Sequence, residues 1–184
     1  MRRPARLALS VGLAALLFLG VTAWALTPAP ELRAKGPVSV TGTEASGSFT
    51  MGTATVRQVR YADRSTLGYR FRLTNAGPAT ARVVGVRAVG PEATLLRVRA
   101  LHTPGGGEVE LAPDDTQEVV LDVLMTDCER LSARAASLVT AVDVELTSWG
   151  RTHVVRVDLP EQLRTGSARE MFCPRATADT RPPG

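Results

Sequence analysis

The stretch Tyr69–Val89 constrains the fold more strongly than any other part of the sequence. Its first half alternates between two kinds of side chain, apolar at Tyr69, Phe71 and Leu73 and basic at Arg70 and Arg72. A repeat of two residues is typical of a β-strand with one buried face. The sequence Asn-Ala-Gly-Pro at 75–78 then predicts a turn, because Asn and Gly tolerate positive φ and Pro fixes its own φ. A second β-branched run follows, so the stretch predicts two strands joined by a turn.

Strand-like segments recur along the rest of the chain, with Gly and Pro between them. Strand character begins at 37–41, and a Gly/Ser/Thr-rich loop is expected at 42–52. The further strand candidates are Thr53–Tyr61, Thr66–Thr74, Ala81–Val89, Thr94–Leu101, Thr116–Thr126, Val139–Thr147 and Arg151–Leu159. About seven or eight short strands without a long helical pattern predict an all-β protein, a β-sandwich.

Three segments have more specific expectations. In Thr94–Leu101 the alternation is irregular, which predicts an edge strand or a bulge. Ser148–Arg151 (Ser-Trp-Gly-Arg) is typical of a tight hairpin with Gly150 in the turn. Cys128–Leu138 is compatible with a short helical link between two strands.

An apolar segment precedes these strands. Leu7–Leu26 has no charged residue, and a helix of that length is about 30 Å long, the thickness of a hydrocarbon core. Arg2, Arg3 and Arg6 precede the segment, whereas the first basic residue after it is Arg33. This asymmetry predicts one N-terminal hydrophobic helix with the N-terminus in the cytoplasm and the rest of the chain exported.

Two interpretations of the segment Leu7–Leu26 remain open. It is long enough to stay in the cytoplasmic membrane as a single-pass anchor. Ala23-Trp24-Ala25 also matches the small-x-small pattern of a signal-peptide cleavage site. Cleavage after Ala25 would give a secreted protein.

The charge of the chain does not indicate nucleic-acid binding. The sequence has 22 basic and 18 acidic residues, and three of the basic residues precede Leu7. The exported part is therefore close to neutral, and no nucleic-acid partner is expected.

The charges are nevertheless segregated along the sequence. Residues 57–99 contain nine arginines and two acidic residues, whereas residues 108–145 contain ten acidic residues and two arginines. In one interpretation the two halves neutralise each other by pairing across strands and sheets. In the other, an exposed face built on Arg70 and Arg72 binds an anionic partner such as anionic lipid, a wall polyanion or an acidic envelope protein.

Cys128 and Cys173 are the only cysteines, 45 residues apart. In an exported protein a disulfide between them is the expected state, and the chain-entropy model gives it about 4 kcal/mol. Two free thiols or a pair of metal ligands are the alternatives.

The sequence predicts no catalytic, cofactor or metal site. His102 and His153 are the only histidines, and no Gly-x-Ser-x-Gly, His-Glu-x-x-His or Cys-x-x-Cys motif is present. His153 is in phase with Val155 and Val157, so we expect it to cap the core near Trp149. His102 is expected to be exposed.

Two stretches carry a family resemblance. Phe71–Ala81 resembles the strand and Thr-Asn-x-Gly turn of bacterial immunoglobulin-like domains, including the adhesion-related type. Leu111–Val123 is similar to their second landmark, a Leu-x-Pro-Gly turn that leads into a strand, with Asp114 in place of the usual Gly. Asp127-Cys128 and Cys173-Pro174 fit the outline of actinobacterial exported proteins of unknown function. The resemblance implies an immunoglobulin-like β-sandwich and says little about function.

These observations divide the chain into five parts: a cytoplasmic n-region (1–6), a transmembrane helix or signal peptide (7–26), a stalk (27–36), an immunoglobulin-like β-sandwich (37–173) and a disordered tail (174–184). We expect a non-enzymatic, membrane-anchored module outside the cytoplasm, with a binding or structural accessory role in the cell envelope. The alternative is a cleaved, secreted ligand-binding protein or enzyme accessory subunit.

Overall fold

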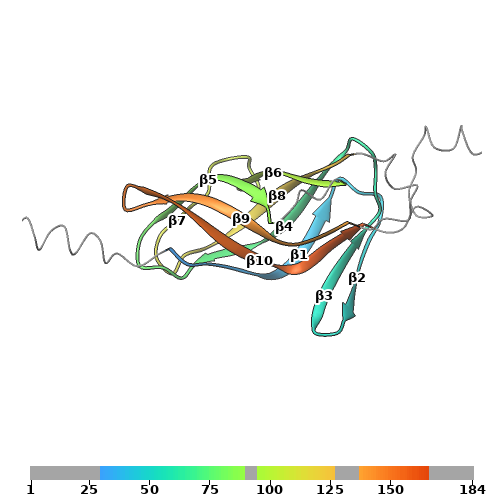
Figure 1. Cartoon of the computed structure of the whole chain (residues 1–184), viewed down its shortest axis with the longest axis horizontal. Coiled ribbons are helices and arrows are strands. Elements are labelled where there is room, and N and C mark those ends of the chain that lie inside the picture. The colour runs from blue at the N-terminus through green and yellow to red at the C-terminus, as the bar shows by residue number, and fades with distance from the viewer. Residues whose placement is uncertain (1–29, 90–94, 127–136, 166–184) are drawn as a thin grey trace, which may run out of the picture.

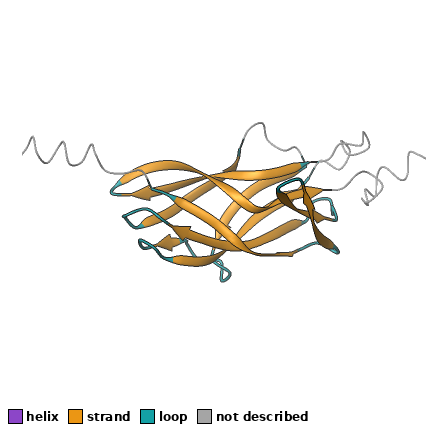
Figure 2. Ribbon diagram, turned by 90° about the horizontal axis from the view of Figure 1, so that it is seen from below, coloured by secondary structure: helices purple, strands orange, loops and turns teal. Residues whose placement is uncertain are grey.

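Two β-sheets form the protein (Figures 1 and 2). The computed structural model describes residues 30–89, 95–126 and 137–165. Its strands are β1 (Leu32–Thr41), β2 (Ser46–Met51), β3 (Ala54–Val59), β4 (Thr66–Asn75), β5 (Ala81–Ala88), β6 (Leu96–His102), β7 (Glu110–Leu111), β8 (Thr116–Met125), β9 (Leu138–Ser148) and β10 (Arg151–Thr165). The predicted all-β, two-layer fold is confirmed for these residues.

The ten strands divide between two sheets. The four-stranded sheet has the order β1-β4-β8-β6, and the six-stranded sheet has the order β2-β3-β10-β9-β5-β7. Neighbouring strands are antiparallel except β3 and β10, which are parallel. Figure 2 shows the two layers with their strands running along the long axis of the molecule. The apolar core lies between them, where alternate residues of both sheets are buried.

The strands with regular alternation are confirmed, but three boundaries in the sequence interpretation are wrong. The expected loop 42–52 contains β2, whose six residues are all exposed and therefore lack an apolar repeat. β1 begins at Leu32, so residues 32–35 of the expected stalk pair with β4, and a register shift between Lys35 and Ser39 hides the periodicity. β10 continues past Leu159 to Thr165 after a second register shift.

The two local expectations for the edge strand and the hairpin are confirmed. β6 is an edge strand, and its register with β8 shifts between Val98 and Ala100, so that Arg99 is the extra residue of a bulge. Trp149 and Gly150 join β9 to β10 with φ values of 54° and 71°. Positive φ at both positions defines the two-residue hairpin turn that matches the twist of the strands.

The side chain of Asn75 connects three segments at the end of β4. Asn75 is 0% exposed, and its Nδ2 donates to the carbonyl oxygens of Ala79, Leu111 and Ala112 at 2.7, 3.0 and 3.2 Å. Its Oδ1 accepts a hydrogen bond from the backbone N–H of Gly77 at 3.0 Å. The amide therefore satisfies buried backbone groups of both stretches that carry the family resemblance.

The turn after β4 has a different physical basis from the one that its sequence indicates. Neither Asn75 nor Gly77 has positive φ. A Cβ atom at Gly77 would instead lie 3.1 Å from the backbone nitrogen of Glu31 and 3.2 Å from Asn75 Oδ1. Gly77 is thus required by close packing against the segment that leads into β1. Positive φ occurs at Asp114, with φ 61°, where the related landmark usually has Gly.

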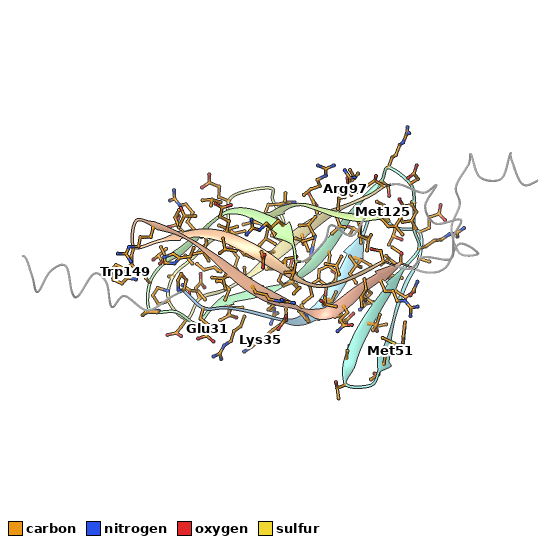
Figure 3. All side chains as sticks on the ribbon, viewed as in Figure 1. Glu31, Lys35, Met51, Arg97, Met125 and Trp149 are labelled. Carbon is orange, nitrogen blue, oxygen red and sulfur yellow. The ribbon has the colours of Figure 1, made fainter. Side chains whose placement is uncertain are left out.

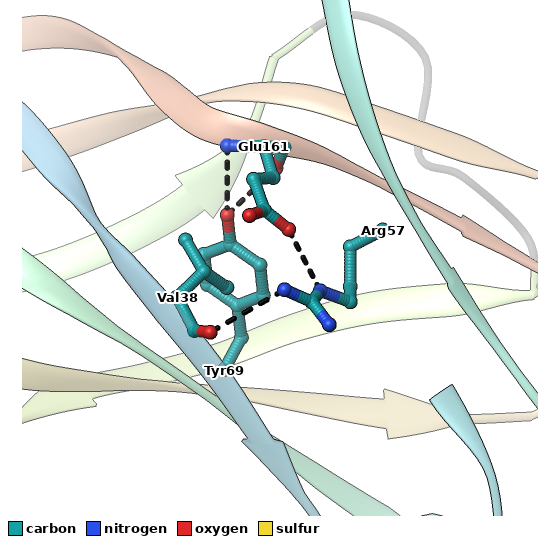
Figure 4. A network of polar contacts seen from close by, with 4 residues as sticks. All are labelled: Val38, Arg57, Tyr69 and Glu161. Atoms are coloured by element: carbon teal, nitrogen blue, oxygen red, sulfur yellow. Dashed lines mark hydrogen bonds and ion pairs between the residues drawn. The ribbon is translucent and has the colours of Figure 1, made fainter. Parts of the chain in front are cut away.

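A second polar network joins the two sheets (Figure 4). The hydroxyl of Tyr69 on β4 donates to the carbonyl oxygen of Glu161 on β10 at 2.6 Å and accepts from the N–H of Glu161 at 3.1 Å. The Glu161 carboxylate pairs with Arg57 on β3 at 2.7 Å, and Arg57 also donates to the carbonyl oxygen of Val38 on β1. Burial raises the pKa of the Tyr69 hydroxyl, which is therefore a neutral donor at every physiological pH.

Several predicted features lie outside the described residues: the segment Leu7–Leu26, Cys128 with Cys173, most of the expected helical link, and the tail 174–184. Within residues 30–89, 95–126 and 137–165, no helix has the length and apolar character needed to cross a membrane.

The Asn75 network predicts a large effect of one side chain on stability. Asn75→Ala leaves the buried carbonyl of Leu111 and the N–H of Gly77 without their partner. We expect the free energy of unfolding of the full chain to fall by about 3 kcal/mol, measured by urea denaturation. The neighbouring Thr74→Ala is the control, because the Thr74 hydroxyl bonds Thr116 at the surface and its loss should cost less than about 1 kcal/mol. Equal effects of both substitutions would contradict the role of Asn75.

Candidate functional site

The outer face of the four-stranded sheet gathers basic side chains. Tyr69, Phe71 and Leu73 of β4 are buried, so the alternate residues Arg70 and Arg72 lie on the opposite face. The charged and titratable residues of this face are Arg33 (paired with Glu31) and Lys35 on β1, Arg70 and Arg72 on β4, Glu118 and Asp122 on β8, and Arg97, Arg99 and His102 on β6. We call this set the basic face.

Lys35, Arg72 and Glu118 form one row of the basic face. Arg72 lies directly opposite Lys35 of β1 on one side and opposite Glu118 of β8 on the other. The Glu118 carboxylate pairs with Arg70, one same-face position along β4, at 3.3 Å. Within the described residues, Lys35 and Arg72 have no ion-pair partner. Two adjacent cations therefore remain uncompensated at the β1 side of the sheet.

The ion pairs of the nine arginines in the segment 57–99 bear on the two interpretations of the segregated charges. Six of them form ion pairs: Arg57 with Glu161, Arg60 with Glu44, Arg64 with Asp63, Arg70 with Glu118, Arg82 with Glu110, and Arg87 with Asp143. Of these six pairs, those of Arg70, Arg82 and Arg87 join the basic half of the sequence to the acidic half. Arg72, Arg97 and Arg99 have no ion-pair partner in the part of the chain that the structure describes. Among the described residues, the arginines of the segment 57–99 are therefore not all neutralised, and those without an ion-pair partner lie on the basic face.

Arg97 and Arg99 occupy the opposite edge of the basic face. Figure 3 places Lys35 and Arg97 at opposite margins of the sheet. Arg72 lies opposite Glu118 of β8, and Arg97 lies opposite Leu124 of the same strand. Measured along β8, the two arginines are therefore about 20 Å apart. The Nε of Arg97 is buried and has no hydrogen-bond partner among the described residues. A buried N–H without a partner is energetically costly.

The six-stranded sheet differs in its charge balance. Its exposed arginines Arg82, Arg87 and Arg156 each have a carboxylate nearby, at 2.7, 3.6 and 3.8 Å. Exposed pairs of this kind contribute little to stability, but they cancel the local field. The exposed arginines are thus paired on the outer surface of the six-stranded sheet, whereas several cations on the outer surface of the four-stranded sheet have no ion-pair partner among the described residues.

His102 lies within the basic face and is half-buried, so its expected exposure is wrong. Its Nε2 lies 3.1 Å from a carboxylate oxygen of Asp122, and its Nδ1 lies 2.6 Å from the carbonyl oxygen of Thr103. Both ring nitrogens face acceptors, so only the protonated ring can donate to both. The Thr103 carbonyl, and with it the Asp122 carboxylate, raises the pKa of His102 above its usual value despite the opposing effect of burial.

The same geometry limits what His102 can do chemically. A general base needs a ring nitrogen free to accept a proton from a reacting group. Both nitrogens of His102 are engaged by Thr103 and Asp122. His102 therefore adds positive charge to the basic face as the pH falls, rather than serving as a base in this conformation.

The remaining candidate residues do not join the basic face. His153 is half-buried on β10 opposite the core residue Leu146, as its phase predicts, whereas Trp149 is 56% exposed. Cys128 and Cys173 lie outside the described residues. Among the described residues, no three His, Cys, Asp or Glu side chains gather in a group that could hold a metal ion.

The pKa of His102 makes stability dependent on pH. The pKa of His102 is higher in the folded chain than in the unfolded chain, where it is about 6.5, so protonation of His102 stabilises the fold. This stabilisation is complete below the pKa of the unfolded chain and is lost as the pH rises through the pKa of the folded chain. We expect the free energy of unfolding of the parent chain to exceed that of the His102→Gln variant, and the difference to be larger at about pH 5.5 than at about pH 8.5. NMR titration should show that Asp122→Asn lowers the His102 pKa. Titration of His102 at or below the ordinary value would contradict this geometry.

No protein-family model matches the sequence, and a search of curated proteins finds no significant match.

Proposed function

We propose that this protein is an immunoglobulin-like module held outside the cytoplasmic membrane, where the basic face binds an anionic component of the cell envelope. The role is binding or structural, as an accessory to another envelope component. The observation that carries the proposal is the uncompensated charge of Lys35, Arg72, Arg97 and Arg99 on one surface, in a chain whose other arginines on the same segment are paired.

The arrangement of the basic face suits an extended anion better than a compact one. Its unpaired cations lie at two margins about 20 Å apart and project from a sheet surface. A phosphate-bearing polymer or a lipid surface presents repeated negative charges over such distances. Arg side chains bind phosphate oxygens with several donors, which favours such groups over isolated carboxylates.

The position of β1 in the sequence brings the basic face close to the proposed anchor. Lys35 follows Leu26 by nine positions, so an extended chain spans at most about 30 Å between them. If the segment Leu7–Leu26 stays in the membrane, the margin with Lys35 and Arg72 lies within reach of the headgroup layer. The immunoglobulin-like assignment is supported by the Asn75 amide, which links the two stretches that resemble such domains.

Binding experiments with matched charge variants test this function. The full chain in neutral detergent is titrated with two probes, a soluble phosphodiester polymer and mixed micelles that contain phosphatidylglycerol. Lys35→Ala combined with Arg72→Ala should weaken binding by about 30-fold at low salt, since each cation near an anionic surface contributes about 1 kcal/mol. Higher salt should weaken binding by the parent chain to either probe.

The control carries the same charge change on the other sheet. Arg156→Ala combined with Arg164→Ala removes two cations from the six-stranded sheet and should leave the affinity within about two-fold of the parent. Preference for one probe identifies wall polymer or lipid as the partner class. Equal losses in both double variants, or binding that does not change with salt, would refute the basic face as the binding surface.

A further inference from the structure

Among the strands of residues 30–89, 95–126 and 137–165, β2 is an edge strand with an open row of backbone groups. It lies at the end of the six-stranded sheet, and its six residues pair with β3 without a register shift. All six residues are exposed. In Figure 1 the hairpin of β2 and β3 extends away from the rest of the two sheets. A regular, exposed edge of this length can accept another strand.

The other three sheet edges in the described residues are protected. β1 has a register shift near Pro37 and carries Lys35. β6 has its bulge and carries Arg97 and Arg99. β7 is two residues long. Bulges, charged residues, proline and short length are the features by which proteins prevent edge-to-edge pairing. β2, with the sequence Ser-Gly-Ser-Phe-Thr-Met, has none of them.

The hairpin that contains β2 is also free of exposed charge. Across 46–59 the only ionisable residue is Arg57, and its guanidinium is directed between the sheets to Glu161 and Val38. Because Arg57 shares its face with the buried Leu163, the adjacent Val56 and its partner Phe49 lie on the opposite face, where Val56 itself is 0% exposed. Phe49 is 42% exposed and Met51 is 50% exposed. Figure 3 shows Met51 on this projecting hairpin.

Each face of β2 matches the same face of a second copy of β2. The odd positions are Gly47, Phe49 and Met51, and the even positions are Ser46, Ser48 and Thr50. In an antiparallel pair, two residues that lie opposite each other both point their N–H and C=O groups toward the partner strand, or both point these groups away from it. A two-fold axis between two copies of β2 therefore pairs odd positions with odd and even positions with even. Apolar residues then meet apolar residues, and hydroxyl groups meet hydroxyl groups.

We infer that β2 pairs with β2 of a second copy of this chain, in antiparallel orientation, so that the two six-stranded sheets become continuous. No like charges oppose each other in any such register, because residues 46–56 are uncharged. The pairing covers Phe49 and Met51 and supplies partners for the open edge. The inference is independent of the basic face, which belongs to the other sheet.

Sedimentation velocity of the full chain in neutral detergent tests the inference. The parent should change from monomer to dimer over a concentration range of about 1–100 µM. Thr50→Lys places a charged side chain on the edge and should weaken self-association at least ten-fold. Thr152→Lys adds the same charge at an exposed position of β10 and should leave self-association unchanged. Ser48→Lys provides a second edge variant in case Thr50→Lys does not fold.

Hydrogen exchange at high and low protein concentration locates the contact. Amides of β2 should exchange more slowly at high concentration, whereas amides of the β1 and β6 edges should not change. A parent chain that remains monomeric throughout the range would overturn the inference. So would a dimer that neither edge lysine weakens, because another segment would then hold the two copies together.

Discussion

The buried amide of Asn75 is the contact on which the rest of the fold depends most. One side chain satisfies backbone groups of the turn after β4 and of the loop before β8, while the backbone N–H of Ala76 bonds the carbonyl oxygen of Glu31 before β1. Three loops at one end of the sandwich are thereby fixed to the end of a single strand. Because the amide is fully buried, any change that removes one of these bonds leaves a polar group without water or protein to replace it.

β4 connects this structural role to the candidate function. Its inward residues run from Tyr69, which bonds the backbone of Glu161 on the other sheet, to Asn75. Its outward residues include Arg70 and Arg72. The strand must keep one register for the inner contacts to form, and the same register places Arg72 between Lys35 and Glu118. The position of the uncompensated cations is therefore a consequence of how the core is assembled.

The sequence predicts the strands that have one buried face, because alternation is a local signal. It predicts β4, β8 and β9 almost at their observed bounds. β2 gives no such signal, since both of its faces are exposed, and the bulge in β1 interrupts the pattern at 36–38. Alternation also cannot reveal which side chains meet. Whether Glu118 neutralises Arg70 depends on the pairing of β4 with β8, which is distant in the sequence, and the contact of His102 with Asp122 depends on the pairing of β6 with the same strand.

The claim that the basic face is the binding surface is tested most directly by a substitution that adds charge to it. Glu118→Gln releases Arg70 from its ion pair, and Glu110→Gln releases Arg82 on the other sheet with the same change in net charge. Affinity of the full chain for the soluble phosphodiester polymer is the quantity to measure. We predict that Glu118→Gln raises the affinity about five-fold and that Glu110→Gln leaves it unchanged. Equal gains in both variants, or no gain in Glu118→Gln, would contradict the account.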